Sequence, residues 1–172
     1  MAAFARRLQS LLRHFWWDDA DVQRVLPSAA LARIEARVAA SEQGHSGQIR
    51  VAVEPGLPWS YLRRGLPARA RAITLFGKLR VWDTEYNNGV LIYLLLAERS
   101  IEIVADRGLA ARVPQPQWTG IVDTMRQTLH AGRFEQGLLA AVDAVDALLR
   151  THFARTGGAA RDNELPDAPV VL

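Results

Sequence analysis

An uninterrupted apolar stretch lies in the middle of the chain, at residues 90–96, between turn-forming residues. A run of this length predicts a strand that is buried on both faces and lies in the centre of a sheet. After a short polar connection, apolar residues alternate with other side chains over residues 101–106, which predicts an antiparallel hairpin. Polar segments 87–89 and 106–108 flank this unit, so the hairpin should bring both to one edge of the sheet.

Other parts of the chain predict helices and one more strand. Helical spacing of apolar residues begins at Pro27-Ser28, resumes after Ser60, and recurs twice in the C-terminal half around a break at Gly132. Alternation over residues 49–53 predicts a first strand, and this strand, the next helix and the buried strand form a βαβ unit. In the helix after Ser60, Pro67 should cause a bend. The predicted buried residues of that helix are Leu66, Ala70, Ile73 and Phe76.

These patterns predict an α/β protein with a small mixed sheet that contains a βαβ unit and an antiparallel hairpin. A chain of 172 residues suits one domain with a substantial core. We expect an N-terminal amphipathic and aromatic helical extension at 1–27, the α/β domain at 28–153, and an irregular C-terminal tail at 154–172, where no periodicity is present.

Composition excludes several classes of function. With no cysteine, the chain has no disulfide, catalytic thiol or thiolate zinc site. The net charge of +3 comes from scattered arginines without basic runs or aromatic platforms, so nucleic-acid binding is not expected. Four dispersed histidines lack metal-ligand spacing, and each is expected at the surface or at a helix end.

The N-terminal residues 1–17 combine an amphipathic helical pattern with aromatic side chains. Arginines interrupt the apolar residues, which excludes the long apolar core of a signal peptide and predicts a cytoplasmic protein. Five apolar residues share one helical face, a pattern that fits docking on the domain, which we favour, or peripheral contact with a membrane. Trp16 and Trp17 are expected to form a packed aromatic anchor.

The predicted polar edge carries oxygen ligands but no familiar catalytic motif. No Walker loop, dinucleotide fingerprint, nucleophile elbow or zinc helix is present. Carboxylates and amide carbonyls suit Ca²⁺ or Mg²⁺, although few carboxylates would hold the ion weakly. The alternative is that Asn-Gly forms an ordinary turn and that Asp106 caps the next segment. The oxygen-bearing residues are Asp83, Thr84, Glu85, Asn87, Asn88 and Asp106.

An ordered series of motifs resembles the TPM domain family, and in particular its short cytosolic bacterial members. The resemblance covers roughly residues 28–172. It implies an α/β/α sandwich, with family members that are weak acid phosphatases, calcium binders or accessory subunits of membrane complexes and receptors. The motifs are SEQGHSGQIRVAVE, TEYNNGVLIYLLL, IEIVADRGL, Trp118, Gly132-Arg133-Phe134 with Gly137, His152-Phe153 and NELPDAPVV.

Two positions depart from the family pattern and remove negative charge. Asn87 stands where the exported branch commonly has Asp, and Gln48 stands where the cytosolic branch usually has Glu. Both differences weaken the expectation of a Ca²⁺ or Mg²⁺ site formed by Asp106, Asn87 and Asn88.

Three hypotheses follow from the sequence. The first is a binding or accessory module that recognises an unknown protein or membrane-complex partner through the sheet edge and its flanking helices. The second is a weak metal-assisted phosphatase with Asp106 and Arg107 as catalytic candidates. Membrane contact through residues 1–17 is compatible with both. The ligand-binding candidates are Thr84, Asn87, Asn88 and Gly89.

Overall fold

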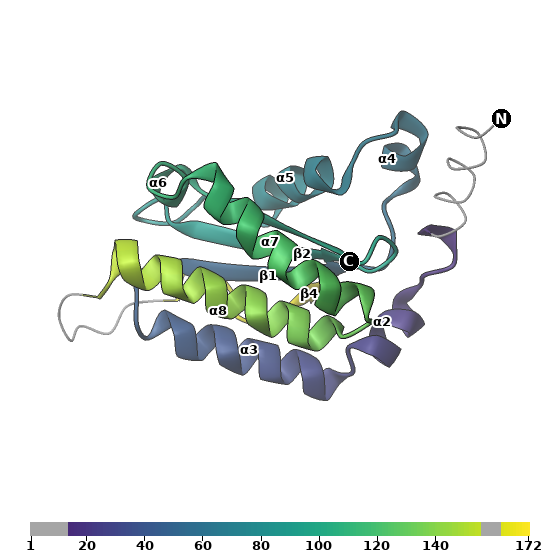
Figure 1. Ribbon diagram of the computed structural model, residues 1–172, viewed down its shortest axis with the longest axis horizontal. Coiled ribbons are helices and arrows are strands. Elements are labelled where there is room, and N and C mark those ends of the chain that lie inside the picture. The colour runs from purple at the N-terminus through teal and green to yellow at the C-terminus, as the bar shows by residue number, and fades with distance from the viewer. Residues whose placement is uncertain (1–13, 156–162) are drawn as a thin grey trace.

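A four-stranded mixed sheet lies at the centre of the protein, in the strand order β3-β2-β1-β4 (Figure 1). The structure is a computed structural model that describes residues 14–155 and 163–172, so most of the segment 1–17 lies outside the described residues. The strands are β1 (Gln48–Glu54), β2 (Gly89–Leu95), β3 (Ser100–Ala105) and β4 (Val170–Val171).

Strand β2 is the apolar run of the sequence, and all of its residues are buried. It pairs in parallel with β1, with Gln48 opposite Gly89, and antiparallel with β3, with Val90 opposite Ala105. The predicted hairpin and the predicted parallel pair are therefore both confirmed. This pairing places the start of β1, the start of β2 and the end of β3 at one edge of the sheet.

Helices cover both faces of the sheet, which confirms the α/β/α sandwich (Figure 1). One core packs the sheet against α2 (Asp19–Val25), α3 (Ser28–Glu42), α7 (Gln115–His130) and α8 (Phe134–Phe153). The second core lies under α4 (Trp59–Arg64) and α5 (Ala68–Lys78). A single-turn helix, α6 (Arg107–Ala110), follows β3 directly.

The segment after Ser60 differs from the prediction, because it forms two helices instead of one bent helix. Helix α4 ends at Gly65, which has a φ of 65°, and α5 begins directly after Pro67. Ile73, predicted to be buried, is 55% exposed. The helix turns a neighbouring face inward because the Arg71 side chain reaches buried Glu54 on β1. The buried residues of α5 are Ala68, Ala72 and Leu75.

The C-terminal segment, predicted to be an irregular tail over residues 154–172, contains the short strand β4. Val170 and Val171 pair in parallel with Ala52 and Val53 of β1. Leu165 joins the second core and is 5% exposed. A two-residue strand is too short for an alternation to be recognised.

Candidate functional site

The polar edge comprises Thr84, Asn87, Asn88, Gly89, Asp106 and Arg107, and the structure brings these residues together. The first four lie in the loop before β2 and at its first residue, and the last two follow β3. The Asp106 amide donates to the Gly89 carbonyl at 2.9 Å, which extends the β2–β3 ladder into the edge. All the residues predicted from the hairpin argument are therefore neighbours.

Asn88 is the most enclosed side chain of the polar edge, with no exposed surface. Its backbone amide donates to Thr84 Oγ1 at 3.1 Å, and its Nδ2 atom donates to Ser46 Oγ at 3.2 Å. Among the described residues, Asn88 Oδ1 has no hydrogen-bond partner. A buried amide oxygen without a partner is costly, so Oδ1 is a good acceptor for a water molecule or a cation.

The two carboxylate oxygens of Asp106 have different surroundings. Oδ1 accepts from the Arg107 amide at 2.7 Å and caps α6, as the capping alternative predicted. Oδ2 is buried and has no partner within the part of the chain that the structure describes. One carboxylate oxygen therefore remains for a ligand, in the same edge as Asn88 Oδ1.

Arg107 and Asn87 bind each other at the exposed side of the edge. Arg107 Nε donates to Asn87 Oδ1 at 3.0 Å. The Asn87 carbonyl also accepts from the Gly108 amide at 2.9 Å, and Asn87 has a φ of 53°, a left-handed value that asparagine tolerates. The Asn87 side chain therefore stabilises the turn, and the nearby guanidinium lowers the affinity of the edge for a cation.

Gly89 allows the loop before β2 to pack closely on the preceding turn. A Cβ atom at this position would overlap the Val81 carbonyl oxygen. This glycine is therefore a packing requirement of the edge, and no described contact gives it a separate ligand-binding role.

Gln48 holds the C-terminal segment beside the polar edge. Its Oε1 atom accepts from the amides of Glu164 and Leu165, each at 3.0 Å. Gln48 has a clear structural use here, because the segment it binds leads to β4.

The structure adds Glu42 and Ser46, which the sequence analysis did not single out, to the surroundings of the edge. Both residues line a cleft of about 180 Å³ with Gln48. Glu42 Oε1 accepts from the Ile49 amide at 2.8 Å. The pKa of Glu42 is raised to about 8, mainly by burial, with a smaller contribution from the charges of Asp167 and Glu164, and the hydrogen bond from the Ile49 amide lowers it in part. A carboxyl with such a pKa in a cleft is a candidate for proton transfer.

His45 also lines this cleft and, contrary to the prediction for the histidines, is buried, as is His14. His45 Nδ1 lies 3.1 Å from the Gly47 carbonyl, which only accepts, so Nδ1 carries the proton. Burial lowers the pKa of His45 to about 4, although Asp146, 3.4 Å from Nε2, raises it. The imidazole is therefore neutral at pH 7. Only the fold could reveal this burial, because the sequence places His45 in a polar connection.

The model of the TPM domain matches residues 20–148 of this sequence, which is most of the chain. The chain belongs to the TPM domain family. No curated protein matches it.

Three solved structures share the fold of this TPM domain. The BA42 protein of Bizionia argentinensis is 24% identical, with a TM-score of 0.71 over 85% of this chain and 94% of that one. The N-terminal domain of a P. gingivalis protein is 21% identical, with a TM-score of 0.61 over 77% of this chain and 83% of that one. The N-terminal domain of cg2496 from Corynebacterium glutamicum is 12% identical, with a TM-score of 0.53 over 80% of both chains. These likenesses support the fold alone.

The polar edge of this TPM domain offers an incomplete set of metal ligands. Asn88 Oδ1 and Asp106 Oδ2 are hard oxygen atoms that no described residue contacts by a hydrogen bond, whereas Ca²⁺ takes six to eight oxygen ligands. In residues 14–155 and 163–172, no group of three or more histidine, aspartate or glutamate side chains could hold a metal ion. The donor set therefore fits a weakly bound, largely hydrated ion. None of the described helices is long and apolar enough to cross a bilayer.

Two aromatic side chains next to the N-terminal segment are exposed. Phe15 and Trp16 are each 80% exposed, and Phe15 lines a cleft of about 260 Å³ with Trp59, which is 60% exposed. Trp17 instead packs edge-on against Phe134, with ring centroids 6.0 Å apart. The predicted aromatic anchor is therefore formed by Trp17 and not by Trp16.

Proposed function

We propose that this TPM domain is a binding or accessory module that recognises a protein or membrane-complex partner. Its function would then require no catalytic turnover. The observation that carries the proposal is that the side chains of the polar edge mainly bond to their own neighbours. Asn87 is bonded to Arg107, Asn88 to Ser46, and one oxygen of Asp106 to the backbone of α6. These bonds shape and stabilise a surface, and they leave few groups for a reaction.

The binding proposal is tested by comparing partner capture with turnover. We expect immobilised wild-type protein to enrich a partner from a lysate of the source cells, identified by mass spectrometry, and Arg107→Glu to lose it. Arg107 is exposed at the edge, so the variant should fold. Arg24→Glu, an exposed change on α2, is the control. Hydrolysis of p-nitrophenyl phosphate that disappears in folded Asp106→Asn would contradict the proposal.

The alternative function, a weak metal-assisted phosphatase, is favoured by Asn88 Oδ1 and Asp106 Oδ2, which have no hydrogen-bond partner among the described residues. These oxygens would hold Mg²⁺ or Ca²⁺, which when bound polarises a phosphate ester and lowers the pKa of bound water. Arg107 would bind the phosphate through the nitrogens that Asn87 does not occupy. Glu42, protonated at neutral pH, is the candidate proton donor for the leaving group.

Calorimetric titration with Ca²⁺ and Mg²⁺ tests this alternative independently of turnover. We expect saturable heat for wild-type protein and none for Asp106→Asn, if the edge binds either ion. Asp83→Asn is the matched control, because Asp83 is exposed in the adjacent loop and pairs with Arg80. Equal heats for all three proteins would remove the polar edge as the metal site, and no heat from any would remove the phosphatase mechanism.

For peripheral membrane contact, we propose that residues 1–17 act together with the exposed rings of Phe15, Trp16 and Trp59. Exposed aromatic side chains favour the boundary between lipid and water. In flotation with anionic phosphatidylglycerol vesicles, wild-type protein should float, and a variant with serine at all three aromatic positions should not. Trp82→Ser, which removes an aromatic side chain that is 50% exposed elsewhere, is the control. Equal flotation of all proteins would contradict this contact.

A further inference from the structure

Strand β3 forms one edge of the sheet and keeps one row of backbone groups unpaired with another strand. Among residues 14–155 and 163–172, only β2 pairs with it. In an antiparallel ladder alternate residues bond to the partner strand. Because the Asp106 amide bonds to β2, the groups of Val104 and Glu102 also face β2, and those of Ile101, Ile103 and Ala105 face outward. An open row of this kind is a template for another strand.

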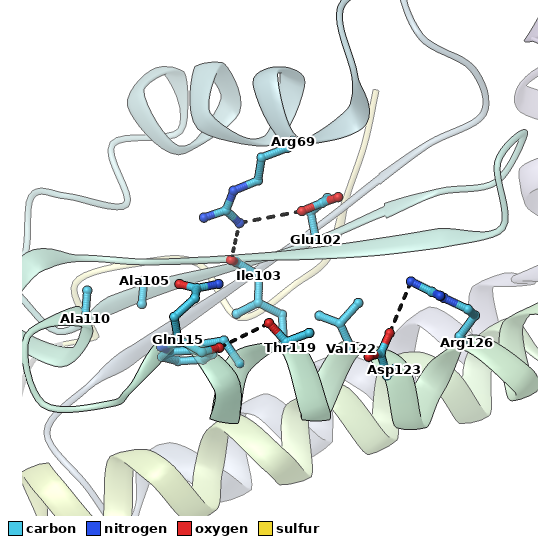
Figure 2. Close-up of a pocket in the computed structure, with 11 residues that line it drawn as sticks. Arg69, Glu102, Ile103, Ala105, Ala110, Gln115, Thr119, Val122, Asp123 and Arg126 are labelled. Atoms are coloured by element: carbon cyan, nitrogen blue, oxygen red, sulfur yellow. Dashed lines mark hydrogen bonds and ion pairs between the residues drawn. The ribbon is translucent and has the colours of Figure 1, made fainter.

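A cleft of about 380 Å³ runs along this open side, between β3 and α7 (Figure 2). Its floor on the strand includes Ile103 and Ala105, and its wall on α7 includes Trp118, Thr119 and Val122. The other α7 residues that line the cleft are polar or charged, namely Gln115, Asp123 and Arg126, and Arg126 pairs with Asp123 at 3.1 Å. The apolar part of the cleft therefore lies between β3 and the side chains of Trp118 and Val122, beside the outward-facing backbone groups.

Arg69 approaches β3 from α5, on the other side of the strand (Figure 2). Its Nη1 atom donates to the Ile103 carbonyl, one of the outward-facing groups, and lies 3.6 Å from Glu102 Oε2. Within the described residues, both recorded contacts use Nη1, so Nε and Nη2 remain able to bind a carboxylate. One turn later on α5, Ile73 is 55% exposed.

We propose that this cleft binds an extended peptide, which adds to β3 as a fifth strand. Side chains of a strand alternate between its faces, so one set would contact Trp118 and Val122 in the cleft beside α7, and the other would face Arg69 on α5. The peptide that fits therefore alternates apolar and acidic residues. The proposal rests on the function as a binding module and names the chemistry of its partner.

A second copy of this chain suits the cleft less well than a peptide does. Arg69 contacts Ile103, near the middle of the six-residue strand β3. Pairing of two β3 strands about a two-fold axis through that region would bring two Arg69 guanidinium groups together, and like charges repel at such distances. An acidic peptide would instead be attracted to the Arg69 guanidinium.

Fluorescence anisotropy with a labelled hexapeptide of alternating valine and aspartate tests the proposal on the full chain. We expect saturable binding that weakens at least about tenfold, or about 1.4 kcal/mol, in Thr119→Trp, because the indole would fill the cleft. Thr124→Trp is the matched control. Both threonines are exposed on α7 and bond to the carbonyl four residues earlier, but only Thr119 lines the cleft.

Two further probes separate backbone pairing and charge from general stickiness. A peptide with the same side chains and N-methyl groups at alternate amides should not bind, because it cannot pair with β3. A valine-lysine peptide should bind at least about tenfold more weakly, because it presents cations to Arg69. On binding of the valine-aspartate peptide, hydrogen exchange at the Ile101 and Ile103 amides should slow.

The outcomes distinguish this inference from the function on which it rests. No binding of the valine-aspartate peptide, or equal binding by Thr119→Trp and Thr124→Trp, would overturn the peptide site and leave partner capture at the polar edge unaffected. A wild-type dimer in sedimentation that Thr119→Trp dissociates would assign the cleft to a second copy and also overturn it. Turnover that depends on Asp106 would instead contradict the binding-module function.

Discussion

The residues of the polar edge differ in how much hydrogen-bonding capacity the fold leaves them. Asn87 Oδ1 is taken by Arg107, whereas Asn88 Oδ1 and Asp106 Oδ2 are buried without described partners. An unpaired buried oxygen costs about 1–3 kcal/mol, so a ligand or water that binds both oxygens stabilises the fold. Glu42 could donate a proton at neutral pH, since burial keeps its carboxyl group protonated there.

The raised pKa of Glu42 predicts a stability that falls as pH rises. The folded state binds this proton up to about pH 8, whereas the unfolded state loses it near 4.5. The free energy of unfolding should therefore decrease through this window, by up to about 5 kcal/mol in total. His45 acts in the opposite direction between about pH 4 and 6.5, because its folded pKa is lowered. The effect of Glu42 is therefore clearest between 6.5 and 8.

Urea denaturation at several pH values measures this dependence. Glu42→Gln keeps an oxygen that can accept from the Ile49 amide and removes the titration. The variant should show a flatter profile than wild type between pH 6.5 and 8. Parallel profiles of the two proteins would show that Glu42 titrates normally.

At Gly89, the first residue of β2, the addition of one methyl group should strongly destabilise the protein. Gly89→Ala should destabilise the protein by about 2–4 kcal/mol, because its Cβ would overlap the Val81 carbonyl oxygen. Gly120→Ala within α7 is the control, since its Cβ would meet no atom within 4 Å. That change should stabilise by about 0.5–1 kcal/mol through helix propensity. Thermal unfolding measures both, and a tolerated Gly89→Ala would contradict the close approach.

At the scale of elements, helix α5 is fixed to the sheet by a buried polar cluster of Glu54, Arg71 and Tyr93. Arg71 Nη2 lies 2.6 Å from Glu54 Oε1, and the Tyr93 hydroxyl donates to Glu54 Oε2 at 2.6 Å. Burial and the Glu54 charge raise the pKa of Tyr93. The cluster determines which face of α5 turns inward, and it explains why Ile73 is exposed.

Removal of the cation from this cluster should leave Glu54, which is 4% exposed, as an uncompensated buried charge. Arg71→Met is therefore expected to cost about 3–5 kcal/mol of unfolding free energy. The matched control is Arg33→Met, because Arg33 makes a comparable two-bond pair with Glu135 at the surface and should change stability by at most about 1 kcal/mol. Urea denaturation compares the two, and equal losses would show that burial of the pair does not matter.

At the level of the complete protein, the C-terminal segment adds β4 beside β1, at the opposite side of the sheet from β3, and passes next to the polar edge. Gln48 binds its backbone through Glu164 and Leu165, and Arg50 Nη1 donates to the carbonyls of Pro166 and Ala168 at 2.6 and 2.5 Å. Two side chains of β1 therefore hold a segment more than 100 residues away in the sequence.

Loss of the hydrogen bonds from Arg50 to the Pro166 and Ala168 carbonyls should release β4 without unfolding the domain. In Arg50→Met, hydrogen exchange at the Leu172 amide, which bonds to the Val53 carbonyl, should accelerate about tenfold or more. The melting temperature should change little, because Gln48 still binds the Glu164 and Leu165 amides and should keep Leu165 in the second core. Arg24→Met, which alters a surface pair on α2, is the control. Unchanged exchange at Leu172 would show that strand pairing alone holds the segment.

The hairpin, the βαβ unit, the two C-terminal helices and the position of the polar edge were all predicted from the pattern of residues along the chain. These features follow from local periodicity and from turns such as the one before Gly89, which need no knowledge of distant residues. The break at Gly132 between the last two helices belongs to this class, with a φ of 76°.

The groups that remain available for binding at these places become known only from the folded structure. The partner of Asn87, the burial of Glu42 and the contact of Arg69 with β3 all depend on residues distant in sequence. The inward face of α5 and the pairing of β4 depend on such contacts too. The physical reason is that hydrogen bonding and desolvation are set by neighbours in space, whereas periodicity records only neighbours along the chain.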